Sequence, residues 1–245
     1  MVTYSFEKGV KFEDVEFGGW KVRFPVVYSD QSRIAATYTV SLSKAKAMLP
    51  SKRLEPLEVK PGLGMLSIIA FEYKAISGLK PYNEFGTFIP VNYRKEDGSL
   101  GETGSYCLHL PVTTERARYG GVAIYGFPKI VTDIEFVHEK DATNCVVWHD
   151  GKTIAELSVR NLEPKRATRR SISYTFKDGS LLKTPVDAEG LVGASQGEDG
   201  AKLKLGTHRI ADELRGLNLG AEAVEYQYIP QMYSLLHKPS ERLPT

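Results

Sequence analysis

The stretch CVVWHDGKTIAELSV, residues 145–159, indicates the fold of this chain most directly. Two runs rich in β-branched residues flank Asp150-Gly151, a dipeptide that adopts the positive φ angles of a tight two-residue hairpin turn. The pattern recurs over residues 171–184, where two further runs flank Asp178-Gly179. Two hairpins of this kind predict a sheet in which neighbouring strands are antiparallel.

Strand patterns dominate the remainder of the chain as well, and helix patterns are few. Further strands are expected near residues 20–28, 65–75, 87–93, 105–112, 131–139, 224–228 and 231–236. Helices are predicted only at residues 43–49 and 207–217, the second capped by Thr207, and the Gly-rich stretch 193–204 is expected to be an exposed loop. We therefore predict a mainly antiparallel α+β fold, with a closed or folded-over, β-barrel-like sheet and a few short helices, as one domain over residues 1–245.

Composition and charge exclude several classes of protein. The 245 residues are 42% hydrophobic and 25% charged, which is typical of a globular chain. The 32 basic and 30 acidic residues give a net charge of +2 without a basic tract, so nucleic acid is not an expected partner. No stretch approaches the ~20 apolar residues of a membrane span, and residues 1–12 lack the apolar segment of a signal peptide. Cys107 and Cys145 are too few for a disulfide framework, which favours a reduced, cytoplasmic setting.

A lysine lies directly behind a proline in YGFPK, residues 125–129, within a run of apolar and small residues from 120 to 131. An ammonium among apolar groups is poorly solvated, so the neutral amine becomes accessible nearer physiological pH. A neutral amine can attack a carbonyl carbon and form a Schiff base. From these residues alone, the more common alternative is a lysine at a strand end whose amine reaches solvent.

The other titratable residues form no recognisable catalytic motif. The five histidines show no metal-binding spacing, and the chain has neither a nucleophile elbow nor a P-loop. His109 lies in an apolar strand, where a hydrogen-bonded core histidine is the alternative to a functional one. Glu84 lies in YNEFG, residues 82–86, where a solvated turn glutamate is the alternative.

Several short motifs, taken in order, resemble the acetoacetate decarboxylase family. Residues 82–86, followed by FIPV at 88–91, resemble that family's Tyr-x-Glu-x-Gly and Ile-Pro-Val segment. GFPK, residues 126–129, resembles its active-site Gly/Ala-Phe/Tyr-Pro-Lys, and LEPL at 54–57 and LGTH at 205–208 are also similar. The order and the spacing of these pieces over most of the chain make the resemblance specific.

The resemblance implies that Lys129 condenses with the ketone of a small β-keto acid. The protonated imine then accepts the electrons released as carbon dioxide leaves, and the enamine is protonated and hydrolysed to a ketone; acetoacetate decarboxylase itself is a known example of such an activated lysine. Because the imine is the electron sink, no cofactor and no metal are implied. Glu84 matches the family's pocket glutamate and would orient or shuttle a proton. The residues expected to line the substrate pocket are Tyr82, His109, Leu110 and Phe127.

Partners follow from the same resemblance. A small keto acid is the expected substrate, neither nucleic acid nor a membrane is an expected partner, and the family resemblance implies a homo-oligomer. The sequence supports the oligomer only weakly, through aromatic residues that are expected to be exposed, namely Tyr226, Tyr228 and Tyr233.

The chain departs from the family pattern at several positions where the family has charged residues. Ile130 replaces the second lysine that many decarboxylases of the family carry, so burial alone is expected to activate Lys129. The family's arginine before the first strand aligns with Lys21, with Arg23 nearby as a substitute, and both are predicted to bind substrate.

Ser67 and Val122-Ala123 also stand where the family has charged residues. These losses leave two alternatives to β-keto acid decarboxylation, which remains favoured. One is a pyruvate aldolase-dehydratase that uses the same lysine, as known in this superfamily. The other is a non-catalytic small-molecule-binding module of the same fold.

Overall fold

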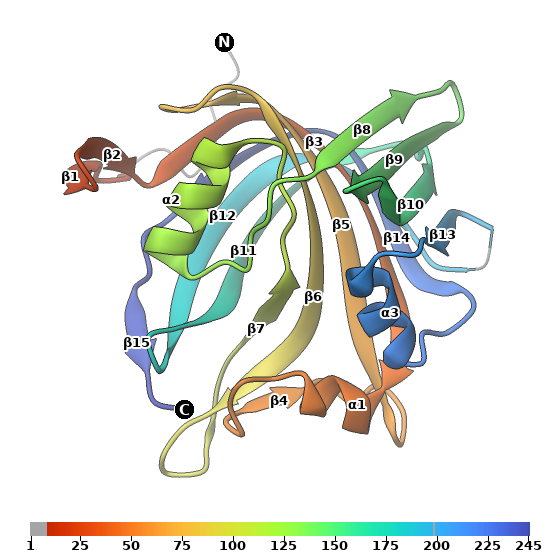
Figure 1. The fold of residues 1–245 in the computed structure, drawn as a ribbon, viewed down its shortest axis with the longest axis horizontal. Helices are drawn as coiled ribbons and strands as arrows, with labels where there is room; N and C mark the ends of the chain where they lie inside the picture. Colours follow the sequence, from red (N-terminus) through yellow and green to blue (C-terminus); the bar gives the residue numbers. More distant parts are fainter. Residues whose placement is uncertain (1–8, 198) are drawn as a thin grey trace.

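The computed structural model describes residues 9–197 and 199–245 (Figure 1). Its strands are β1 (Glu13–Phe17), β2 (Trp20–Phe24), β3 (Val26–Ser41), β4 (Leu54–Pro56), β5 (Leu63–Ile76), β6 (Tyr82–Arg94), β7 (Leu100–His109), β8 (Asp133–His138), β9 (Ala142–His149), β10 (Lys152–Arg160), β11 (Lys165–Lys177), β12 (Ser180–Ser195), β13 (Ala201–Leu205), β14 (Ala223–Leu236) and β15 (Glu241–Leu243). Its helices are α1 (Leu42–Ala47), α2 (Glu115–Tyr125) and α3 (Arg209–Gly216).

A nine-stranded sheet forms the body of the protein, in the order β11-β7-β6-β5-β3-β14-β12-β15, with β4 on β6. β11 also pairs with β12 along its whole length, so the sheet folds over on itself. A four-stranded sheet, β13-β10-β9-β8, packs beside it, and β1 and β2 form a separate hairpin. The predicted α+β fold with a folded-over, mainly antiparallel sheet is confirmed.

The two predicted hairpin turns are present. Asp150 and Gly151 have φ angles of 50° and 71°, and Asp178 and Gly179 have φ angles of 49° and 75°. These are the positive φ angles that a two-residue turn requires at both positions, and they connect β9 to β10 and β11 to β12.

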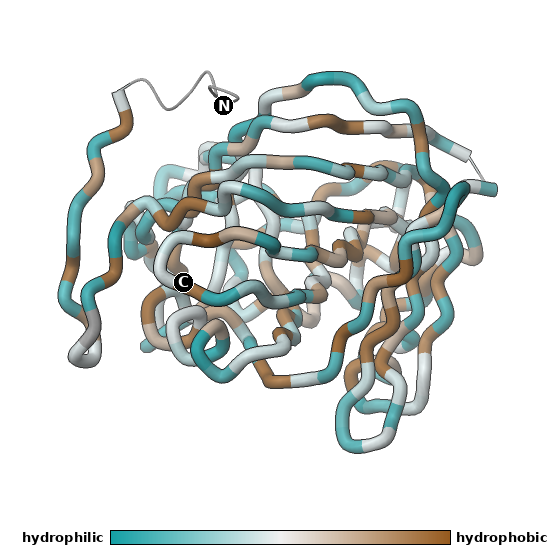
Figure 2. Tube along the Cα trace, turned by 90° about the horizontal axis from the view of Figure 1, so that it is seen from above, coloured by the Kyte–Doolittle hydropathy of each residue, from teal (hydrophilic) through white to brown (hydrophobic). Residues whose placement is uncertain are grey.

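The large sheet separates two hydrophobic cores. Alternate residues of β5 point to opposite faces, so Leu66 and Ile68 join one core while Phe71 and Tyr73 join the other. The first core is completed by the four-stranded sheet and α3, and the second by α2. Figure 2 shows the long strands as a curved layer along which hydrophobic and hydrophilic residues alternate.

Helix α2 was not among the predicted elements. Gly120 and Gly121 in its middle have low helix propensity, and this obscured the helical pattern. Two signals for the helix are nevertheless present in the sequence. The Thr114 hydroxyl caps its first turn by accepting from the Ala117 amide, and Gly126 ends it with a φ angle of 65°.

Three further expectations are corrected. The stretch 193–204 is not one exposed loop, because β12 extends to Ser195 and β13 begins at Ala201 and pairs with β10. His208 rather than Thr207 caps α3. Tyr226 and Tyr233 are buried, at 2% and 4% exposed, because β14 lies inside the sheet between β3 and β12. No helix in the described part of the chain is long and apolar enough to span a membrane.

The cap of α3 makes stability sensitive to pH. The His208 Nδ1 atom accepts from the Ile210 amide at 3.2 Å, so this nitrogen must be unprotonated in the folded protein. Burial, and after it the neighbouring His149, lower the pKa of His208. The unfolded chain therefore binds more protons, and the contribution of this cap is present above pH ~6.5 and declines as pH falls through that value.

We expect the urea midpoint of unfolding to fall between pH 7.5 and pH 5.5, and to fall less in His208→Asn, which keeps a cap acceptor without a titrating ring. The pKa of His109 is also lowered, chiefly by burial, so part of the decline should persist in this variant. Equal declines in the two proteins would contradict the assignment to His208.

Candidate active site

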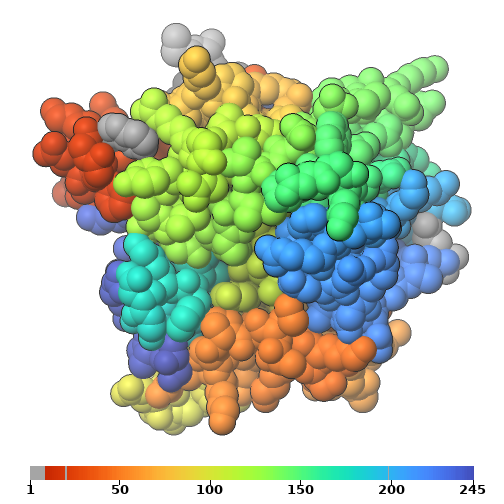
Figure 3. Space-filling view, viewed as in Figure 1, coloured from red at the N-terminus to blue at the C-terminus, as the bar shows by residue number. Residues whose placement is uncertain are grey.

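The segment after α2 places Lys129 beneath that helix. Gly126 reverses the chain, and the Phe127 amide donates back to the Gly121 carbonyl at 3.1 Å. The Leu110 amide donates to the Pro128 carbonyl at 3.2 Å, so residues 127–130 run alongside the end of β7. In Figure 3, α2 and the segment after it, in yellow-green, form the surface over this end of the sheet.

Lys129 and Glu84 form a buried ion pair. The Lys129 Nζ atom lies 2.6 Å from Glu84 Oε2, and each side chain is only 6% exposed. Glu84 lies on β6, where its backbone bridges to Val112, and Val112 in turn bridges to Val131. The lysine amine therefore does not reach open solvent, and the glutamate is not a solvated turn residue.

The electrostatics of the pair combine two opposing effects. Burial disfavours both the ammonium and the carboxylate, whereas each charge stabilises the other at this distance. Transfer of one proton from Nζ to Glu84 converts the charged pair into a neutral amine and a neutral acid. The expectation that burial alone activates Lys129 is thus incomplete, because the structure adds a proton acceptor in direct contact with the amine.

Aromatic rings surround the pair. The Lys129 Nζ atom lies 5.6 Å from the centre of the Tyr82 ring and 5.7 Å from that of Phe127. The Tyr73 hydroxyl donates to Glu84 Oε1 at 3.1 Å, and the Tyr28 and Tyr82 hydroxyls are 3.3 Å apart. Burial, reinforced by nearby charges, raises the pKa of Tyr73 and of Tyr82 well above the usual range, so both remain protonated.

Arg33 brings a second cation to this face of the sheet. On neighbouring strands β3, β5 and β6, Arg33 pairs with Phe71, and Phe71 pairs with Glu84, so the three lie in one row. The guanidinium lies 4.9 Å from the centre of the Phe71 ring and donates to neutral oxygens, at 2.9 Å to Gln31 and 3.4 Å to Ser234. With Glu84 ionised, the residues Lys129, Arg33 and Glu84 carry one surplus positive charge.

Arg33 was not among the predicted site residues, because the first long strand was expected to end near residue 28. β3 in fact extends to Ser41. The signal that could have identified it is the alternation of buried residues from Ile34 to Val40, which places Arg33 on the opposite face of the strand from Ile34.

Lys21 and Arg23, which are predicted to bind substrate, are not brought to this site. Both are exposed on β2 of the outer hairpin, and the Arg23 guanidinium lies over the ring of Phe12 at 4.8 Å. β1 and β2 form their own hairpin instead of joining the main sheet, and this keeps both side chains on the outer hairpin.

The fold places three of the four predicted pocket residues around Lys129. Tyr82, Leu110 and Phe127 lie in the core that surrounds Lys129. His109 does not contact Lys129 in the structure. Its Nδ1 atom lies 2.9 Å from the Thr87 hydroxyl and its Nε2 atom 2.8 Å from Glu213 of α3, so the ring connects β7 to β6 and to α3.

Gly121 leaves the space that the lysine side chain occupies. A Cβ atom added there would lie 2.5 Å from both Cδ and Cε of Lys129. We expect Gly121→Ala to displace the amine and to lower kcat by about 100-fold, the usual cost of a displacement of about 1 Å at a reacting group.

The matched control is Gly120→Ala. Gly120 is the neighbouring glycine of the same helix, and a Cβ atom added there has nothing within 4 Å. Steady-state kinetics of both variants check the prediction. Equal effects of the two substitutions would show that the loss comes from the helix and not from the lysine.

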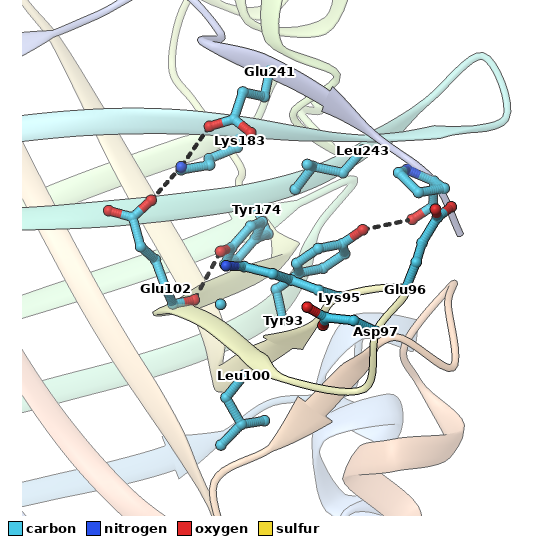
Figure 4. A pocket seen from close by; sticks show the side chains of 12 residues that line it. Tyr93, Lys95, Glu96, Asp97, Leu100, Glu102, Tyr174, Lys183, Glu241 and Leu243 are labelled. Atoms are coloured by element: carbon cyan, nitrogen blue, oxygen red, sulfur yellow. Dashed lines mark hydrogen bonds and ion pairs between the residues drawn. The ribbon is translucent and has the colours of Figure 1, made fainter.

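A separate depression of about 780 Å³ opens on the surface at the other end of the sheet (Figure 4). Lys183 lies there between the carboxylates of Glu102 and Glu241, while Tyr93 and Tyr174 stack at 6.3 Å. The lining of this depression includes neither Lys129 nor Glu84, so these two residues are not part of it.

Known proteins are similar to this chain in sequence and in fold. A curated relative, acetoacetate decarboxylase 3 of Mesorhizobium japonicum (strain LMG 29417 / CECT 9101 / MAFF 303099), is 28% identical over 158 residues, or 64% of this chain. The match spans 57% of the relative's own length.

Two solved structures share the fold. Acetoacetate decarboxylase from Legionella pneumophila superposes with a TM-score of 0.67 at 17% identity, covering 89% of this chain and 88% of the other. The enduracididine biosynthesis enzyme MppR, complexed with the condensation product of pyruvate and imidazole 4-carboxaldehyde, gives 0.63 at 15% identity, with 89% and 88% covered. A family model described as acetoacetate decarboxylase (ADC) matches residues 18–240. Since that model spans nearly the whole chain, the chain belongs to the acetoacetate decarboxylase family.

Proposed function

We propose that this protein is a lyase that forms an imine between Lys129 and a small β-keto acid and releases carbon dioxide from it. The observation that carries the proposal is the buried ion pair of Lys129 and Glu84, with its nitrogen and oxygen 2.6 Å apart. A primary amine beside a proton acceptor, in a core closed to bulk water, has the arrangement that carbonyl addition needs.

The reaction follows from these groups. Glu84 takes a proton from Lys129, and the free amine attacks the ketone carbon to give a carbinolamine. Proton return from Glu84 allows water to leave and produces the protonated imine. The bond to the carboxylate then breaks, its electron pair moves into the imine to form an enamine, and carbon dioxide departs. Protonation of the enamine carbon and hydrolysis of the imine release the ketone and regenerate Lys129.

The charge of the site supports a substrate with a single carboxylate. Arg33 binds only neutral side-chain oxygens among the described contacts, so its guanidinium is available for an anion. The aromatic surroundings favour loss of that carboxylate as carbon dioxide, because charge is less localised in the transition state than in the ground state.

Condensation of pyruvate with an aldehyde on the same lysine is the second candidate. The structure of MppR with a pyruvate condensation product supports it, since that protein shares this fold. Val122-Ala123 on α2 also places apolar groups where the decarboxylase pattern has charges.

Borohydride trapping tests the imine. We expect reduction in the presence of acetoacetate to add the mass of the ketone-derived adduct to Lys129, with release of carbon dioxide before trapping. Pyruvate with an aldehyde should instead produce a conjugated chromophore if condensation is the reaction. A folded protein that gives no adduct with either substrate would overturn the proposal and favour a binding module.

Arg33 provides a further prediction. We expect Arg33→Gln to raise KM for the keto acid by about 10- to 100-fold with a smaller change in kcat, which corresponds to loss of one charged hydrogen bond. The measurement is the KM and kcat of both Arg33→Gln and Arg23→Gln. An increase in KM confined to Arg23→Gln would restore the sequence-based assignment.

A further inference from the structure

We propose that Tyr73 is a positioning residue that controls how Glu84 and Lys129 share a proton. The inference rests on the proposed function for its catalytic consequence, but its physical basis is independent of the substrate. Tyr73 lies on β5, two residues after Phe71, the direct cross-strand neighbour of Glu84.

The two oxygens of the Glu84 carboxylate have separate donors. Oε2 accepts from Lys129 at 2.6 Å, and Oε1 accepts from the Tyr73 hydroxyl at 3.1 Å. A carboxylate held by one donor can turn about its Cγ–Cδ bond, whereas one held at both oxygens keeps a single oxygen directed at the amine. Tyr73 therefore orients the proton acceptor of Lys129.

The ring of Tyr73 is itself held on several sides. Ring centres lie 4.5 Å away for Tyr28, 4.8 Å for Tyr82 and 5.6 Å for Phe71. Tyr73 is 7% exposed, so water has little access to replace its hydroxyl. The hydroxyl is thus a fixed donor.

Donation from Tyr73 stabilises the carboxylate more than the carboxylic acid. It therefore opposes transfer of the Lys129 proton to Glu84 and favours the carboxylate of Glu84 over its acid form. The other titratable groups around the pair are Tyr28 and Arg33 of β3, Tyr82 of β6 and Cys107 of β7. Burial raises the pKa of Tyr28, Tyr82 and Cys107, so these three remain neutral, and Arg33 remains a cation.

Ser67 stands where the family pattern has a second glutamate, but it does not orient Glu84. Its hydroxyl lies 3.0 Å from that of Thr37 on the neighbouring strand. In this chain the second group bonded to Glu84 is a neutral donor, the Tyr73 hydroxyl. Glu84 itself is the one carboxylate that the described contacts place on the Lys129 amine.

The test is Tyr73→Phe, with Tyr125→Phe as its matched control. Both changes remove one buried hydroxyl from the same core, but the Tyr125 hydroxyl has no hydrogen-bond partner among the described residues. The primary measurement is a pH titration of the Glu84 side-chain carboxyl carbon signal by NMR in protein labelled with ¹³C-glutamate, without substrate.

We expect Tyr73→Phe to raise the midpoint at which the Glu84 carboxyl loses its proton by about one pH unit, the size expected for loss of one hydrogen bond to a charged group. The acid limb of the kcat/KM profile, which requires Glu84 as a carboxylate, should move in the same direction. Tyr125→Phe should leave the midpoint at the wild-type value.

Equal midpoints in wild type and Tyr73→Phe, or equal shifts in the two variants, would overturn the inference. Failure of the proposed function is a different result, namely no borohydride adduct in the wild-type protein. Because the titration needs no substrate, the role of Tyr73 is decided in either case.

Discussion

Replacing Lys129 with alanine is expected to lower turnover of a keto acid by about 10⁴-fold or more, the range seen when a covalent nucleophile is removed. Among the described residues, Lys129 is the one amine paired with Glu84, so we expect no other described lysine to replace it. Steady-state kinetics and borohydride trapping, both compared with wild type, measure the loss. Residual turnover within tenfold of wild type would contradict the assignment.

A folding defect could imitate this result, and the ion pair itself provides the control. Lys129→Ala leaves Glu84 buried without its cation, which costs about 3–5 kcal/mol of stability. Lys129→Met combined with Glu84→Gln removes both charges, so we expect its unfolding midpoint to lie closer to that of wild type while the imine is still lost. A double variant less stable than Lys129→Ala would show that the pair does not have this energetic role.

Glu84→Gln is expected to lower the rate of imine formation by about 10²- to 10³-fold, the usual contribution of a general acid–base group. Glutamine retains the shape and an oxygen for Tyr73, but it cannot accept the proton of Lys129. The buried ammonium also loses its counter-ion, so the amine should become neutral at lower pH while the maximal rate falls. Single-turnover trapping over a range of pH separates these two effects.

Glu84→Asp is the matched comparison for that experiment. Aspartate keeps the carboxylate but shortens the side chain by one methylene, and we expect it to recover about tenfold of the rate that glutamine loses. A Glu84→Gln variant that forms imine within threefold of the wild-type rate would show that another group moves the proton.

The fold was predictable where local sequence determines local geometry. Asp150-Gly151 and Asp178-Gly179 form the expected turns because few other residues adopt positive φ angles there. α2 was not predictable from pattern alone, because Gly120 and Gly121 weaken it, and Gly121 is needed for contact with a residue eight positions later.

The sequence predicted the ion pair of the candidate site and part of its wall, namely Tyr82, Leu110 and Phe127. Lys129 and Glu84 stand in short motifs whose order resembles a family, and their proximity follows from that resemblance. Arg33 and Tyr73 stand in no motif. They reach the site because β3, β5 and β6 are neighbours in one register, and register depends on pairings between residues far apart in the chain.

The amino-acid sequence by itself therefore determined the antiparallel hairpins and the family, and it identified Lys129 as the proposed reacting amine. Turn geometry and short motifs are local properties, so they can be recognised from the sequence without the rest of the molecule. Only the tertiary structure decided which charges surround that amine: it leaves Lys21 and Arg23 on the outer hairpin, brings Arg33 into the same row as Glu84, and places Tyr73 on Glu84. The physical reason is that desolvation and hydrogen bonding act through space, between side chains that the folded sheet brings together.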